Sequence, residues 1–281
     1  MKKAIPVLLF SLLVALLVGC GGPSPSTDPN ATAPAPAPKV HKPLFEGTPG
    51  YILQFNKDNF KPGLNAQDDL GLSVAIAMDI SGSMADPPES QPGGTPKYIQ
   101  STRALGTIAN YLIDLAKSHK NMKIRICILR FSDHVEEVLP LTTLDADGIT
   151  KLNDAINPDN FQPNGGTAIG RAMEVESEIL AQSGTVYNSL FIVTDGENNI
   201  DPNPKDVMKA IYSNRNNIST DEFQVETSTQ MTSFVGFDVQ SSQFGEFKGL
   251  GARIASADNQ AEIEASLKGF LAADIKNLEN K

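Results

Sequence analysis

The 281-residue sequence contains no tryptophan, only two cysteines and only three histidines. Two cysteines far apart cannot form a disulfide framework, and three histidines are few for a zinc enzyme. Positive charge is also scarce, because 23 lysines and arginines face 33 acidic residues, for a formal net charge of −10. A chain of this charge is repelled by phosphate groups, which argues against binding to nucleic acid or anionic lipid headgroups. The 40% of hydrophobic residues are enough for one large domain or two small ones.

The N-terminus has the features of a lipoprotein signal peptide over residues 1–19. Two lysines precede an uncharged apolar run that ends at Gly19 and is too short to span a bilayer comfortably. The run closes with Leu17-Val18-Gly19-Cys20, which resembles a bacterial lipobox. The resemblance implies that Cys20 is lipidated and that the chain is anchored in the cell envelope, outside the cytoplasm. Because Gly21 rather than Asp follows, the outer membrane is the expected destination in a Gram-negative host. The alternatives are an ordinary signal peptide or a short membrane helix.

Three further segments follow the signal peptide. Residues 20–44 comprise Cys20 and a tether with seven prolines, which favours extended polyproline II over a packed structure. Residues 45–70 are a lead-in that could add an edge strand around Leu53 and Phe55. Residues 71–281 form the predicted folded domain, in which we find no internal repeat.

Apolar runs typical of buried strands alternate with helical patterns along this domain. Strands are expected at 70–78, 123–131, 135–141, 189–194, 232–239 and 253–257, with 135–141 as a short edge strand. Helices are expected from Thr95-Pro96 to about His119, around 149–156, at 169–180, from Asn203-Pro204 onwards, and at 263–275. This alternation predicts an α/β fold, with a Rossmann-like, doubly wound, mostly parallel sheet that has one short antiparallel edge strand.

Polar side chains gather in three segments where strands end or helices begin. Asp79-Ile80-Ser81-Gly82-Ser83 follows the first strand, Asn164-Gly165-Gly166-Thr167 precedes a helix, and Thr194-Asp195-Gly196 follows the strand at 189–194. Ligands of open α/β sheets bind at the carboxyl ends of the strands, so we expect these segments to converge.

The expected site offers oxygen atoms and neither thiolate nor imidazole. Two carboxylates, Asp79 and Asp195, and three hydroxyls, Ser81, Ser83 and Thr167, suit a hard divalent cation, Mg²⁺ above all, while Mn²⁺ or Ca²⁺ also fit. Repulsion between the two carboxylates leads us to expect that Asp195→Ala raises stability in metal-free buffer. Cys127, in the middle of a strand, is expected to be a buried and inert thiol.

The three segments resemble the metal-ion-dependent adhesion site of von Willebrand factor type A domains. The resemblance covers about residues 70–278 and includes the strand Phe234-Val235-Gly236-Phe237 with the helix and short strand after it. It implies that Ser81, Ser83 and Thr167 bind the metal directly or through water, that Asp79 and Asp195 do either, and that a partner protein supplies an Asp or Glu to the sixth position.

The leading functional interpretation is a lipid-anchored, non-enzymatic module that captures an acidic side chain of a protein partner through Mg²⁺. A metal-assisted hydrolase with the same cation is an alternative, for which Asp86 and Glu89 are the nearby candidates for a general base. An envelope stress or assembly subunit is a second alternative.

The proline-rich segment from Ala85 to Lys97 separates the Asp-x-Ser-x-Ser motif from its helix. A loop of this length is often functional, and we expect it, with Asp86 and Glu89, to select the partner. Asp86 also matches the first of two acidic ligands of an adjacent metal site in integrin β-type domains. Pro87 occupies the second position, which argues against an adjacent site.

Overall fold

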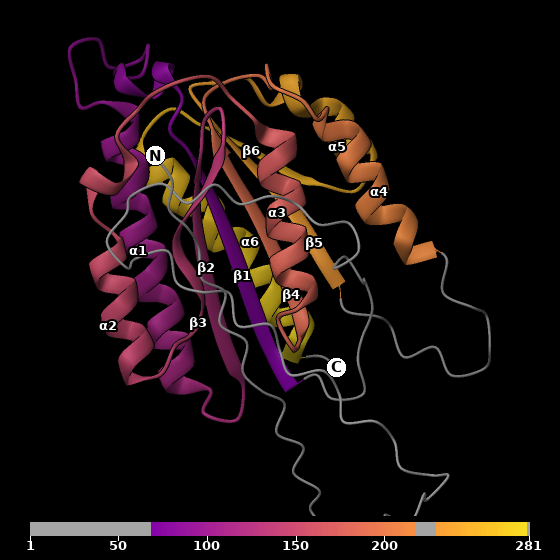
Figure 1. Ribbon diagram of the computed structural model, residues 1–281. Helices are drawn as coiled ribbons and strands as arrows, with labels where there is room; N and C mark the ends of the chain where they lie inside the picture. Colours follow the sequence, from indigo (N-terminus) through magenta and orange to yellow (C-terminus); the bar gives the residue numbers. More distant parts are fainter. Residues whose placement is uncertain (1–68, 217–228, 280–281) are drawn as a thin grey trace, which may run out of the picture. The chain divides into compact units, whose positions relative to one another are not determined.

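The computed structural model describes residues 69–216 and 229–279 (Figure 1). The predicted signal peptide, Cys20, the tether and the expected strand around Leu53 and Phe55 lie outside the described residues. Within the described ranges, no helix is long and apolar enough to cross a membrane.

Six strands form one sheet with the order β3-β2-β1-β4-β5-β6. All neighbouring strands are parallel except β2 and β3, which are antiparallel, so the predicted fold class is confirmed. β2 and β3 lie on one side of β1, and β4, β5 and β6 lie on its other side. This reversal of strand order between β1 and β4 is where α/β sheets bind ligands. The bounds are β1 Asp69–Asp79, β2 Lys123–Phe131, β3 Val135–Thr143, β4 Thr185–Thr194, β5 Thr229–Phe237 and β6 Arg253–Ala257.

Helices cover both faces of the sheet (Figure 1). Side chains of α1, α2 and α6 share one hydrophobic core with Val74 and Ile76 of β1, and those of α3, α4 and α5 share a second core with Ala75 and Ala77. The alternation along β1 follows from the two-residue period of a strand, and burial on both faces explains its nearly continuous apolar sequence. The helices are α1 Lys97–Ser118, α2 Ala146–Ala155, α3 Ile169–Ala181, α4 Pro204–Asn216, α5 Gly245–Gly249 and α6 Gln260–Glu279, with 3₁₀ turns at Gly82–Ala85, Pro158–Phe161 and Ser241–Phe244.

Several element ends differ from the predicted ones. Thr95 is not the N-cap of α1, since the cap is Pro96 without a side-chain hydrogen bond, and the first helical N–H, that of Lys97, donates to the carbonyl of Asp86. β3 extends to Thr143, which pairs with Arg125 of β2. β5 ends at Phe237 rather than Val239, because Asp238 adopts a positive φ of 59° that leaves the strand conformation.

Candidate functional site

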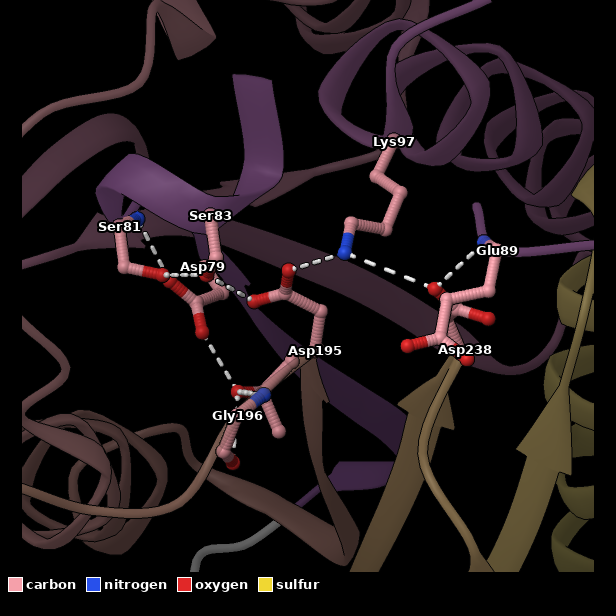
Figure 2. Close-up of polar contacts among 9 residues, drawn as sticks. Asp79, Ser81, Ser83, Glu89, Lys97, Asp195, Gly196 and Asp238 are labelled. Atoms are coloured by element: carbon pink, nitrogen blue, oxygen red, sulfur yellow. Dashed lines mark hydrogen bonds and ion pairs between the residues drawn. The ribbon is translucent and has the colours of Figure 1, made fainter. Parts of the chain in front are cut away.

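The three predicted segments meet at the carboxyl edge of the sheet, where Figure 2 shows side chains of the Asp79–Ser83 and Thr194–Gly196 segments in contact. Asp79 ends β1 and Thr194 ends β4, and these neighbouring strands are in register at Met78 and Val193. The segment that ends at Thr167 is joined to the segment after β1 by backbone hydrogen bonds. The Asn164 N–H donates to the Ile80 carbonyl at 2.6 Å, and the Gly82 N–H donates to the Gly165 carbonyl at 3.1 Å. The topology thus unites segments that lie far apart in the sequence, since Ser83 and Asp195 are 112 residues apart.

Asp79 lies at the bottom of this site and is 1% exposed. Its Oδ1 accepts a hydrogen bond from the Ser81 N–H at 2.7 Å, and its Oδ2 accepts one from Thr194 Oγ1 at 2.5 Å. Burial raises the pKa of Asp79 to about 7, and the nearby Asp195 adds to the increase, while the hydrogen bonds from Thr194 and Ser81 oppose it. Both oxygens are therefore held in fixed directions by neighbouring donors.

Three oxygen atoms form a continuous chain of contacts above Asp79. Ser81 Oγ lies 3.2 Å from Ser83 Oγ, and Ser83 Oγ donates to Asp195 Oδ1 at 2.8 Å. Neighbouring oxygens around an octahedral Mg²⁺ with bonds of 2.0–2.1 Å lie about 2.9 Å apart, so these spacings fit a small six-coordinate cation. In the described residues no group of three or more His, Cys, Asp or Glu side chains is placed to hold a metal. A cation bound here therefore needs the hydroxyl oxygens as well as the carboxylates.

Thr167 approaches the same edge from the start of α3. Its N–H donates to Asn199 Oδ1 at 2.8 Å, and its carbonyl accepts from the Asn199 N–H at 3.0 Å. A Cβ atom placed on Gly196 would lie 3.9 Å from Thr167 Oγ1, so the threonine hydroxyl faces the turn that carries Asp195. The residue is 4% exposed. The structure therefore brings all five predicted ligand residues to one end of the sheet.

Lys97 is a member of the site that the sequence analysis did not identify (Figure 2). Its Nζ lies 2.7 Å from Asp195 Oδ2 and 3.7 Å from Asp238 Oδ2. The Asp195 side chain is fully buried and that of Lys97 is 10% exposed, so this ion pair is largely shielded from water. A lysine in the first turn of a helix is disfavoured by the helix dipole. This unfavourable position is the sequence signal that could have identified Lys97 as a residue with acidic partners.

The two acidic residues of the proline-rich loop do not join the oxygen set. The side chains of Asp86 and Glu89 are exposed, and Glu89 approaches the site only through its backbone N–H, which donates to Asp238 Oδ2 at 2.9 Å. The loop is nevertheless fastened on two sides, because Ser90 Oγ also donates to the Asp258 carbonyl at 3.2 Å. These two hydrogen bonds hold the loop beside the site.

The fold and the oxygen set at the strand ends define a Rossmann-like α/β domain with a cluster of polar side chains at the carboxyl edge of its sheet. A family model described as the von Willebrand factor type A domain matches residues 73–237, and the chain therefore belongs to this family. A comparison with curated proteins found no match.

Solved structures share the fold at low sequence identity. The pilus adhesin SpaC from Lactobacillus rhamnosus GG is 16% identical, with a TM-score of 0.54, over 77% of this chain and 32% of that one. A von Willebrand factor type A protein from Catenulispora acidiphila is 17% identical, with a TM-score of 0.52, over 72% and 42%. The PilB minor pilin from Streptococcus sanguinis is 12% identical, with a TM-score of 0.52, over 77% and 63%. The chain thus spans about a third to two thirds of these proteins.

Proposed function

We propose that the chain is a non-enzymatic binding module of the bacterial cell envelope that captures a protein partner through a divalent cation. The contact chain from Ser81 through Ser83 to Asp195, above the buried Asp79, carries the proposal. Family membership supports it, as does the likeness in fold to a pilus adhesin and a minor pilin.

The cation, Mg²⁺ in the first place and otherwise Mn²⁺ or Ca²⁺, would be held by Asp79, Ser81, Ser83, Thr167 and Asp195. When bound, it supplies a Lewis-acidic centre that attracts an anionic oxygen. The protein side chains fix the geometry in advance: Thr194 and the Ser81 N–H orient Asp79, and Ser83 orients one oxygen of Asp195. Because the residue set contains two carboxylates, Asp79 and Asp195, the charge of a bound cation would not be over-neutralised, and an Asp or Glu of the partner would complete its ligands.

The partner-selecting element is the loop at residues 85–96. It contacts the Asp238 carboxylate and the Asp258 carbonyl, and its turns are closed by the Gln91 N–H to Pro88 and the Gly94 N–H to Gln91 hydrogen bonds, both 2.8 Å. Its prolines reduce the entropy lost on ordering. The cation would thus supply a common attraction and the loop would supply selectivity. Lipidation of Cys20 would place this surface on the envelope, at the outer membrane in a Gram-negative host.

The metal-assisted hydrolase has less support in the described residues. A hydrolase needs a general base beside the cation. Asp86 and Glu89 are exposed, and the side chain that contacts Asp195 from the loop side is the cationic Lys97.

The test is capture from envelope extracts by the full-length chain in detergent, with Mg²⁺, with EDTA, and with Mg²⁺ restored. We expect a partner that is retained only when the cation is present and that is lost in Asp79→Ala. Replacing residues 86–95 with a short Gly-Ser link should leave Mg²⁺ affinity nearly unchanged and weaken capture by about tenfold or more. Equal capture by the Asp79→Ala variant, or capture insensitive to EDTA, would contradict the proposal.

A further inference from the structure

Lys97 occupies an unfavourable position that only its acidic neighbours compensate. It is the first residue of α1, where the helix dipole disfavours a cation, and it is 8% exposed. Burial of an ammonium group costs several kcal/mol unless carboxylates are close to it. Asp195 and Asp238 provide these carboxylates, at 2.7 Å and 3.7 Å from Nζ.

The ion pair divides the two oxygens of Asp195 between two tasks (Figure 2). Oδ1 accepts the hydrogen bond of Ser83 and faces the hydroxyl set, while Oδ2 faces the Lys97 ammonium. As long as Lys97 holds Oδ2, Asp195 offers a cation only one oxygen. The ammonium also draws negative charge away from that remaining oxygen, which weakens the attraction for any cation.

Magnesium and calcium differ in the ligands that they require. Mg²⁺ takes six ligands in a strict octahedron, for which a carboxylate that offers one oxygen suffices. Ca²⁺ takes six to eight oxygens at longer distances and often binds both oxygens of one carboxylate. Masking of Asp195 Oδ2 therefore handicaps Ca²⁺ more than Mg²⁺. This argument rests on the proposed cation site and goes beyond it by assigning its selectivity to one residue.

We propose that Lys97 is the specificity-determining residue of the cation site, which selects Mg²⁺ over Ca²⁺ by occupying the second oxygen of Asp195. Asp238 moderates this effect, because it shares the ammonium and so prevents Lys97 from neutralising Asp195 completely. The Glu89 N–H, which donates to the same Asp238 Oδ2, keeps Asp238 in place.

The experiment is a calorimetric titration of the full-length chain in detergent with Mg²⁺ alone and with Ca²⁺ alone. In Lys97→Met we expect both affinities to rise and the Ca²⁺ affinity to rise at least about tenfold more than that for Mg²⁺. The matched control is Lys205→Met, which removes an exposed lysine paired with Glu246 on α4 and α5. This control should keep the wild-type ratio.

Asp238→Asn provides an independent test that leaves Lys97 in place, and asparagine tolerates the positive φ of this position. Here Lys97 pairs with Asp195 alone, so we expect both affinities to fall and the preference for Mg²⁺ to remain. If Lys97→Met folds and its ratio of Mg²⁺ to Ca²⁺ affinity is unchanged, the inference is overturned. If Lys97→Met does not fold, unchanged Mg²⁺ and Ca²⁺ affinities in Asp238→Asn overturn it. Absence of saturable binding in the wild type would instead contradict the proposed function itself.

Discussion

Two regions of this domain bury a pair of acidic side chains and place them in opposite surroundings. At the carboxyl edge of the sheet, Asp79 and Asp195 contact hydroxyls, a backbone N–H and an ammonium group. On the face covered by α3, Glu137 and Glu176 are also buried, and both raise the pKa of the Cys127 thiol, after burial itself. Among the described residues, the acids of the first region have more hydrogen-bond donors around them than those of the second.

The second region shows what burial does to an acid that lacks partners. Glu176 is 0% exposed, and neither of its carboxylate oxygens has a hydrogen-bond partner of normal geometry in the described residues. Burial raises its pKa well above the ordinary value, although the backbone of Ala77 acts in the opposite direction. Burial likewise raises the pKa of Glu137 to about 7. Burial drives both acids towards the neutral form, and it raises the pKa of Asp79 to about 7 as well. The two regions therefore differ in the hydrogen-bond donors that hold the Asp79 oxygens in fixed directions, and not in the direction of the pKa shift.

The largest effect is expected from Glu176→Leu in the interior. Leucine fills a similar volume and removes a polar group that has no good partner, so the free energy of unfolding should rise by about 3 kcal/mol at pH 7.5. Urea denaturation of both proteins measures the change. A lower stability of the variant would mean that Glu176 makes a favourable interaction absent from our account.

Asp195→Ala should have the opposite effect in metal-free buffer. The sequence led us to expect stabilisation through relief of repulsion with Asp79, but the Lys97 ion pair reverses the expected sign. The substitution leaves a buried ammonium with only the more distant Asp238, so we expect a loss of about 2 kcal/mol. Denaturation in EDTA decides between the two signs.

Glu137 should make stability depend on pH. Its folded pKa of about 7 exceeds the ordinary value of 4.5, so the native state binds more protons than the unfolded state between these values. The stabilisation is therefore present below about pH 4.5 and is lost as the pH rises through 7. Glu137→Gln should flatten the fall in unfolding free energy over this window more than Glu136→Gln does. Equal slopes would contradict the burial argument.

The smallest effect concerns the reactivity of the two cysteines. Cys127 is fully buried and its thiol pKa is raised, so alkylating reagents should modify it only after unfolding.

Mass spectrometry should find Cys20 acylated at the mature N-terminus and Cys127 unmodified. An unacylated chain released into the medium would remove the envelope anchor from the proposal.

Local patterns were sufficient to predict much of the fold. The uncharged runs of β1 and β4 identify buried parallel strands, and the positions of Asp79 and Asp195 at their ends predict convergence. The exact start of α1 could not be predicted, because the Lys97 N–H is satisfied by the Asp86 carbonyl, a loop contact that makes a Thr95 cap unnecessary.

The contacts of Lys97 also lay beyond sequence reasoning. Its partners Asp195 and Asp238 follow β4 and β5, and no local pattern specifies which loop a helix start will face across the edge of a sheet. The same holds for Glu137 and Glu176, which sequence patterns place on a strand and a helix without showing that both are buried and affect the same thiol, that of Cys127.

The most direct test of the account is a Mg²⁺ titration of the full-length chain beside Asp79→Asn and Glu176→Gln. Each variant removes one acidic group, the first at the strand ends and the second in the interior. We predict saturable binding to one site in the wild type and in Glu176→Gln, and loss of that binding in Asp79→Asn. Equal Mg²⁺ affinity in all three proteins would contradict the account.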